Sequence, residues 1–186
     1  MICWQVILQT MQGLIAYLKQ SCDAEDVRQK GVVIGYDHRE KGSLSSKHFA
    51  EICVSVLLSQ NFRVILLEDF VPTPFVPFGI THYGCAAGIM VTASHNPKED
   101  NGFKVYWGNG AQIIPPHDAG IAQCISENLK PWVASYNTST AHFYSHEQFH
   151  VLTEELAEHY YRRMEAVSVP YAPVAPPLKI AYTAMQ

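Results

Sequence analysis

Short β-branched runs alternate with amphipathic stretches in the first half of the chain, and this alternation constrains the fold more than any other feature. Residues 32–36, 63–67 and 86–91 are mainly apolar, which is typical of strands buried on both faces. Helical periodicity separates these runs. Strand–helix alternation predicts an α/β fold, a parallel-rich mixed sheet sandwiched between helices. Sheets of this kind bind ligands beyond the carboxyl ends of their strands.

The helices expected before residue 100 follow from apolar spacing and punctuation. Residues 3–20 carry an i, i+4, i+7, i+8, i+11 apolar stripe, which indicates an amphipathic helix. Ser45 and Ser46 can cap a second helix that runs to about Ser59. A third helical stretch follows the prolines at positions 72 and 74 and extends to about Tyr83.

Beyond residue 100 the pattern changes. Residues 103–107 and 111–114 flank Gly108-Asn109-Gly110, which predicts a β-hairpin with an Asn-Gly turn after the serine-containing loop described below. A helix is expected from Pro115 to about Lys130, a surface loop over residues 131–144, and a further helix over 147–167.

Proline density predicts the domain organisation. Residues 1–167 form the first domain, and residues 168–177 form a linker containing four prolines. Residues 178–183 have the composition of a new strand, so residues 178–186 are expected to open a truncated second domain.

Composition excludes several classes of protein. The chain has 186 residues, 48% of them hydrophobic, and a formal net charge of −4, which excludes a disordered chain and disfavours a nucleic-acid partner. It contains no run of 18 apolar residues, so no membrane association is expected. The five cysteines are scattered without a Cys-x-x-Cys pair, which favours a reducing compartment and a cytoplasmic location.

The segment that carries the chemistry directly follows the third predicted strand. Thr92-Ala93-Ser94-His95-Asn96-Pro97 places a hydroxyl nucleophile at the carboxyl edge of the sheet, and Lys104 adds a cation nearby. A polar loop without chemistry is the plain alternative. His95 is adjacent to Ser94, where neighbouring side chains point apart, so a hydrolase triad is disfavoured. A phosphoserine that passes on its phosphoryl group needs positive charge and in-line access instead.

These residues resemble a known family. Thr92 to Pro97, followed by Asn101-Gly102-Phe103-Lys104, resembles the active-site serine loop of the α-D-phosphohexomutase superfamily. The run from Met90 to Asp118 is similar to one branch, the phosphopentomutases that also act as phosphoglucomutases, together with the glucose-1,6-bisphosphate synthases. The resemblance implies the first domain of such an enzyme.

The same resemblance implies roles for individual residues. Ser94 would be phosphorylated by a sugar bisphosphate and would exchange its phosphoryl group with pentose or hexose monophosphates, with Mg²⁺ bound through an oxygen of that phosphate. His95 and Lys104 would contact substrate and serve as general acid and base. The residues implied to bind substrate or phosphate are Asp37, Arg39, Asn96 and Asn101.

The sequence also departs from the family pattern. The Asp-Gly-Asp metal loop, the sugar-reading third and fourth domains and the N-terminal Gly-Thr-Ala-Gly-Leu-Arg element have no counterpart in it. The chain alone is therefore expected to be inactive. The alternatives are a glucose-1,6-bisphosphate synthase, a non-catalytic truncated or binding fragment, and a phosphatase in which water replaces the sugar hydroxyl.

Other polar positions have simpler interpretations. His117 and Asp118 are expected to cap a helix, and Tyr106 and Trp107 to pack the hairpin on the sheet. Three histidines at i, i+4, i+8 lack a carboxylate or cysteine to complete a metal site; they are His142, His146 and His150. Three charged residues after Pro97 are interpreted as a solvated loop: Lys98, Glu99 and Asp100.

Overall fold

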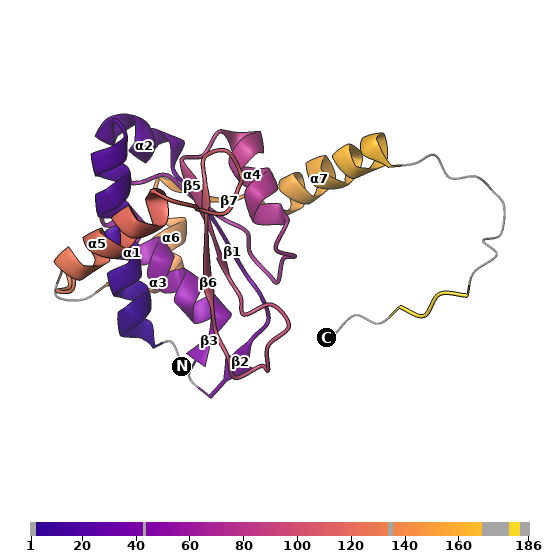
Figure 1. Cartoon of the computed structure of the whole chain (residues 1–186), viewed down its shortest axis with the longest axis horizontal. Helices are drawn as coiled ribbons and strands as arrows, with labels where there is room; N and C mark the ends of the chain where they lie inside the picture. The colour runs from indigo at the N-terminus through magenta and orange to yellow at the C-terminus, as the bar shows by residue number, and fades with distance from the viewer. Residues whose placement is uncertain (1–2, 43, 134–135, 169–178, 183–186) are drawn as a thin grey trace.

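The chain forms a five-stranded mixed sheet between two layers of helices (Figure 1). A computed structural model describes residues 3–42, 44–133, 136–168 and 179–182. The strand order is β6-β5-β1-β4-β7, and only the β5–β6 pair is antiparallel. The strands are β1 (Val32–Tyr36), β4 (Val64–Leu66), β5 (Ala87–Val91), β6 (Phe103–Trp107) and β7 (Phe149–Val151). The predicted α/β fold class is confirmed.

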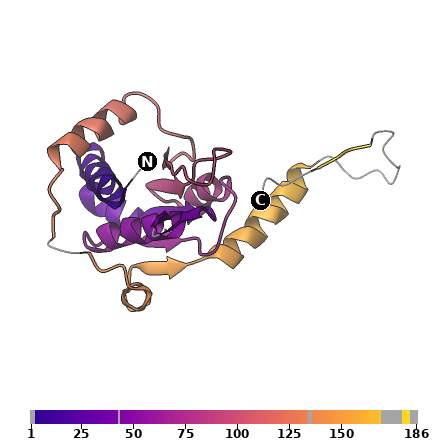
Figure 2. The same cartoon turned by 90° about the horizontal axis from the view of Figure 1, so that it is seen from below.

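Each face of the sheet has its own apolar core. Residues that alternate along β1 point to opposite faces, so that Ile34 joins one core and Val33 the other. The larger core lies under α1 (Trp4–Ser21), α2 (Ala24–Lys30), α3 (Ser46–Leu58), α5 (His117–Glu127) and α6 (Thr140–Tyr144). The smaller core lies under α4 (Phe75–Tyr83) and α7 (Thr153–Val167), the latter extending beyond the body of the domain (Figure 2).

The first two predicted helices form where their apolar spacing indicates. The five stripe residues of α1 are all buried: Ile7, Met11, Leu14, Ile15 and Leu18. The hydroxyl of Ser45 accepts a hydrogen bond from the backbone N–H of His48 at 3.0 Å, which caps α3 as expected. Gly84 ends α4 in the left-handed conformation that favours glycine.

Gln12 is fully buried in α1, and it interrupts an otherwise apolar face. Its amide nitrogen donates to the carbonyl oxygens of Asn128 and Lys130 at 2.7 and 2.9 Å. Its amide oxygen accepts from the Trp132 backbone N–H and the Tyr136 hydroxyl at 2.9 and 3.0 Å. Because every polar group of the amide is satisfied, this side chain fastens the segment after α5 to α1.

Two predictions about the region after residue 130 are wrong. The expected helix 147–167 begins only at Thr153, since residues 149–151 form β7 and pair with β4 through Val64↔Phe149 and Leu66↔Val151. Tertiary pairing with a buried strand overrides the local helical pattern. The expected loop 131–144 contains α6, which Ser139 caps.

The hairpin prediction is confirmed in its turn and its first arm. The backbone of Gly110 is left-handed (φ 76°) and donates to the carbonyl oxygen of Trp107 at 2.8 Å. The returning segment pairs through a single bridge, Tyr106↔Gln112, instead of a full strand. The sequence pattern gave no indication of α2, which Asp23 caps, or of the short ribbon β2 (Glu40–Lys41) and β3 (Leu44–Ser45).

The proposed linker falls almost entirely outside the described residues, which end at Ser168 and resume at residue 179. Residues 179–182 form no strand, and the rest of the strand predicted over 178–183 lies outside the described part of the chain. The division into a first domain and the start of a second therefore stays a prediction. Among the helices of the described ranges, none combines the length and apolar character needed to cross a bilayer.

Candidate active site

Two loops meet where β1 and β5 end. These strands run parallel and in register through Tyr36↔Val91, so the segments that follow them leave the same edge of the sheet. The backbone N–H of Asp37 donates to the carbonyl oxygen of Val91 at 3.2 Å, which extends the ladder by one residue. The fold thus brings Asp37 and Arg39 beside the Ser94 loop, 55 to 61 residues later in the chain.

Arg39 is the structural centre of this edge. Its side chain is only 5% exposed, and its Nε donates to Asp37 Oδ2 at 2.9 Å. One terminal nitrogen donates to the Asn96 and Pro97 carbonyl oxygens at 2.9 and 2.6 Å and lies 3.3 Å from that of Asp100. The other donates to the carbonyl oxygen of Ser94. The guanidinium therefore holds the loop by its backbone from inside the turn.

Asp37 connects Arg39 to a third element. The hydroxyl of Ser46, in the first turn of α3, donates to Asp37 Oδ1 at 2.7 Å and lies 3.2 Å from Asn101 Oδ1. Both oxygens of the Asp37 carboxylate are thereby engaged, since Oδ2 accepts from Arg39. One network consequently fixes the end of β1, the start of α3 and the segment that leads into β6.

Ser94 projects from this fixed loop into solvent. Its backbone is left-handed (φ 55°), a conformation that serine adopts uncommonly and that the loop's other bonds must hold in place. Its N–H donates to the Thr92 hydroxyl at 2.9 Å. The loop carries its hydroxyl residue at the tip of a turn, where a ligand can reach it.

Lys104 lies beside that hydroxyl. It is the second residue of β6 and pairs with Met90 of β5, and its ammonium donates to Ser94 Oγ at 2.6 Å. The approach of the two segments depends on Gly102. A Cβ at this position would lie 2.3 Å from the carbonyl oxygen of Thr92, and the Thr92 N–H donates to the Gly102 carbonyl at 3.1 Å.

His95 and Asn96 are both exposed at the tip of the loop. Within the described ranges, His95 makes no hydrogen bond to the Ser94 hydroxyl, whose partner is Lys104. The Asn96 amide nitrogen lies 3.4 Å from Asp100 Oδ2. The exposed Asp100 side chain therefore contacts the loop that carries Ser94.

The structure brings Ser94 and Lys104 into direct contact and places Asp37, Arg39 and Asn101 in the network beneath them. The sequence reasoning missed three positioning residues in this network: Ser46, Thr92 and Gly102. The sequence predicts Ser46 only as a helix cap, and a hydroxyl that follows a predicted strand end is the available signal for a partner of Asp37. The Asn-Gly pair at 101–102 was the available signal for Gly102.

Two further predictions concern histidines. His117 stacks on Trp107 with ring centroids 4.1 Å apart and shares a hydrogen bond with the Tyr17 hydroxyl at 3.1 Å. It therefore packs the hairpin against α1, while Asp118 alone accepts a first-turn N–H, that of Ala119. Among the described residues, His142, His146 and His150 are not part of a metal-binding group.

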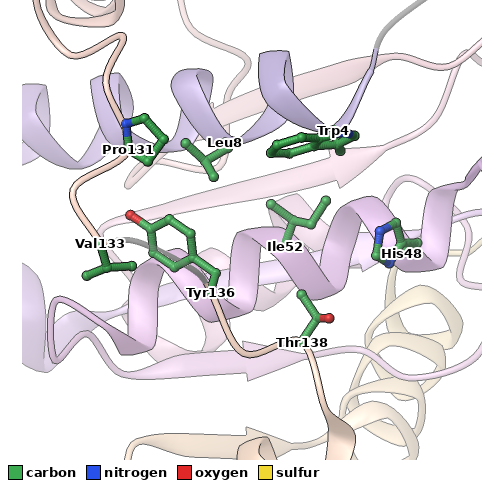
Figure 3. Close-up of a pocket in the computed structure, with 8 residues that line it drawn as sticks. All are labelled: Trp4, Leu8, His48, Ile52, Pro131, Val133, Tyr136 and Thr138. Carbon is green, nitrogen blue, oxygen red and sulfur yellow. The ribbon is translucent and has the colours of Figure 1, made fainter.

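A cavity of about 290 Å³ lies between α1, α3 and the segment after α5 (Figure 3). Its described lining is mostly apolar and includes none of the predicted site residues. The lining residues are Trp4, Leu8, His48, Ile52, Pro131, Val133, Tyr136 and Thr138. The solvent-exposed Ser94 loop, and not this cavity, is therefore the candidate site for phosphate chemistry.

Comparison with known proteins identifies the family to which this fold and site correspond. Residues 4–131 match the family described as phosphoglucomutase/phosphomannomutase, alpha/beta/alpha domain I. The chain belongs to this family. The match ends before α6 and includes every residue of the Ser94 network.

Individual relatives sharpen the comparison. The chain is 52% identical to the phosphopentomutase of Homo sapiens over 135 residues, which cover 72% of this chain and 22% of that protein. It is 46% identical to the glucose 1,6-bisphosphate synthase of Homo sapiens over 133 residues, 70% of this chain and 21% of that protein. The chain thus spans about a fifth of the length of these relatives.

A solved structure shares the fold. The crystal structure of a putative phosphomannomutase from Thermus thermophilus superposes with a TM-score of 0.69 at 23% sequence identity. The superposition covers 89% of this chain and 32% of that one. At this identity the likeness concerns the fold alone.

Proposed function

We propose that this chain is the phosphoserine-bearing domain of a sugar-phosphate mutase, with Ser94 as the residue that carries the phosphoryl group. The observation that carries the proposal is the 2.6 Å contact between the Lys104 ammonium and Ser94 Oγ, on a loop held by the buried Arg39. Phosphoryl transfer depends chiefly on positioning and on positive charge near the transferring group, and this edge of the sheet supplies both.

In the proposed transfer, Ser94 Oγ is the leaving group and a sugar hydroxyl is the nucleophile. The bond between phosphorus and Ser94 Oγ breaks while a bond forms between phosphorus and a sugar hydroxyl oxygen. The Lys104 ammonium, within hydrogen-bonding distance, stabilises the negative charge on Oγ and supplies its proton. The proton of the sugar hydroxyl passes to the exposed His95 ring beside the loop. In the reverse direction, Ser94 takes a phosphoryl group from the sugar bisphosphate.

Proteins of this family typically use Mg²⁺. Among the described residues, no group of three or more carboxylates or imidazoles that could hold a metal lies around Ser94, and both carboxylate oxygens of Asp37 are engaged by Arg39 and Ser46. Mg²⁺ favours a nearly complete shell of oxygen ligands. An oxygen of phosphorylated Ser94 would be one ligand, and we therefore expect the 186-residue chain to show no turnover alone.

The substrate class proposed is a pentose phosphate, with hexose phosphates as further substrates. The support is the 52% identity to a phosphopentomutase, together with 49% identity over 125 residues to a probable phosphoribomutase of Schizosaccharomyces pombe. The second candidate is a glucose 1,6-bisphosphate synthase, which the 46% identity to such a protein supports. Both candidates would use the same phosphoserine: a mutase regenerates its sugar bisphosphate, whereas a synthase that makes this bisphosphate needs another phosphoryl donor to rephosphorylate the serine.

A graft tests the proposal. Residues 4–131 replace the matching segment of the human phosphopentomutase, and the purified chimaera is assayed with ribose 1-phosphate, glucose 1-phosphate and a sugar bisphosphate. We expect mutase turnover that Ser94→Ala abolishes while the thermal unfolding profile stays the same. A folded chimaera that only releases inorganic phosphate would favour the phosphatase alternative. A folded chimaera whose mutase turnover survives Ser94→Ala would contradict the proposal.

A further inference from the structure

Three side chains that can ligate a metal meet where α4 packs against α7. His82 lies in the last turn of α4, and Glu155 and His159 lie on α7. One ligand atom of each lies within 4.8 Å of those of the other two. Glu155 and His159 are spaced i, i+4, so they share one face of their helix.

Neighbouring rings hold the two imidazoles. The His82 and His159 rings lie 4.4 Å apart between centroids, with an angle of 38° between their planes. Phe78, one turn earlier on α4, stacks on His82 with ring centroids 5.5 Å apart and an angle of 13° between the planes. His82 is therefore oriented toward α7 by an aromatic contact within its own helix.

The carboxylate is oriented by a tyrosine. The hydroxyl of Tyr83 donates to Glu155 Oε1 at 3.2 Å. Hydrogen bonds of this kind fix ligating carboxylates in metal sites.

We propose that His82, Glu155 and His159 form a binding site for a divalent transition-metal ion of the Zn²⁺ type that joins α4 to α7. Two imidazoles and one carboxylate are a donor set that Zn²⁺ accepts, with the fourth tetrahedral position left to water. Mg²⁺ and Ca²⁺ favour all-oxygen ligands and do not suit two imidazoles.

To surround a Zn²⁺ ion, the three donor atoms need only a rotation of their side chains. Donor atoms around tetrahedral Zn²⁺ lie about 3.3 Å apart, closer than the 4.8 Å limit that encloses the present ones. His82 and Glu155 are exposed and His159 is half-buried, so rotation about their side-chain bonds can close the gap.

The site is separate from the proposed catalytic chemistry. α4 returns the chain from the carboxyl edge to the start of β5, so His82 precedes that strand while Ser94 follows it. The five residues of β5 span about 16 Å. A metal at this position would act on α7, which extends beyond the body of the domain (Figure 1), and not on the Ser94 loop.

Zinc titration by calorimetry tests the site in the 186-residue chain. The Cys22→Ser background removes an exposed thiol that could bind zinc. We expect one Zn²⁺ per chain, with Glu155→Gln and His159→Gln each weakening the affinity at least about tenfold. His142→Gln, a histidine of α6 outside the cluster, is the matched control and should leave the affinity unchanged. Circular dichroism confirms that each variant is folded.

Cobalt absorption supplies a second measurement. Co²⁺ added to the same chain is expected to give the intense visible bands of tetrahedral coordination, which His159→Gln should remove and Tyr83→Phe should weaken. Zinc affinity in His159→Gln equal to that of the parent, or an effect of His142→Gln as large as that of His159→Gln, would overturn the proposal.

Discussion

The Ser94 loop and the contact between α4 and α7 are held by different interactions. At the carboxyl edge, one buried guanidinium binds Asp37 and the backbone carbonyls of the Ser94 loop. Between α4 and α7, ring contacts and one hydrogen bond from Tyr83 hold His82, Glu155 and His159. The Ser94 hydroxyl, which the proposed phosphoryl transfer needs in an accurate position, has a rigid support. The cluster of His82, Glu155 and His159 is held less firmly, so an added ion can organise it.

The largest expected effect on stability is at Arg39. Arg39→Leu leaves the Asp37 carboxylate and several loop carbonyls without their partner, and we expect it to lower the free energy of unfolding by about 3–5 kcal/mol. Denaturant unfolding measures the change. Arg162→Leu is the control, because the Arg162–Glu158 pair is about 70% exposed and should contribute little. Equal losses of unfolding free energy in both variants would show that Arg39 stabilises the fold no more than an exposed arginine does.

Lys104→Met tests the proposed electrostatic role. The change removes the only ammonium bonded to Ser94 Oγ in the described part of the chain, so transfer in the chimaera should slow by about 10²–10³-fold. Lys104→Arg retains the charge and should recover part of the rate. Steady-state kinetics measures both, and a rate for Lys104→Met equal to that of the parent would show that this contact does not assist transfer.

Gly102→Ala tests the close approach that brings Lys104 to the loop. The added Cβ would meet the Thr92 carbonyl oxygen at 2.3 Å, and relief of this contact should cost about 1–3 kcal/mol of unfolding free energy. Gly108→Ala is milder, because its Cβ would lie 3.1 Å from the Ala86 carbonyl oxygen. Thermal unfolding should rank the two variants in this order, and the reverse order would refute the packing argument.

The smallest effect on stability is expected at His159, in the cluster between α4 and α7. In metal-free buffer, His159→Gln should change the unfolding free energy by less than about 0.5 kcal/mol, since the ring contacts it removes are at the surface. Zn²⁺ should raise the melting temperature of the parent but not of this variant. Equal zinc-dependent stabilisation of both would place the ion elsewhere.

The sequence predicts the elements whose signals are local. The α1 stripe, the Ser45 cap and the apolar runs of β1, β4 and β5 each depend on neighbouring residues, and the structure confirms them. β7 was missed because its strand conformation depends on pairing with β4, about 85 residues earlier. No local pattern encodes such a partner.

The residues of the candidate site also differ in whether the sequence alone reveals them. Ser94 and Lys104 could be found because a hydroxyl after a buried strand and a nearby cation are visible in the sequence. The inward orientation of Arg39 could not be predicted, because its acceptors are backbone carbonyls that only the folded loop presents. The cluster of His82 with Glu155 and His159 was missed for the same reason, since Glu155 lies 73 positions after His82 in the chain.

Mass spectrometry of Ser94 tests the central claim most directly. The chimaera is incubated with a sugar bisphosphate, quenched and digested, and the peptide that contains Ser94 is sequenced. The account predicts a phosphate on Ser94, which is lost when excess sugar monophosphate is added and never forms in Ser94→Ala. A folded, active chimaera whose Ser94 carries no phosphate, or whose phosphate lies on another residue, would contradict it.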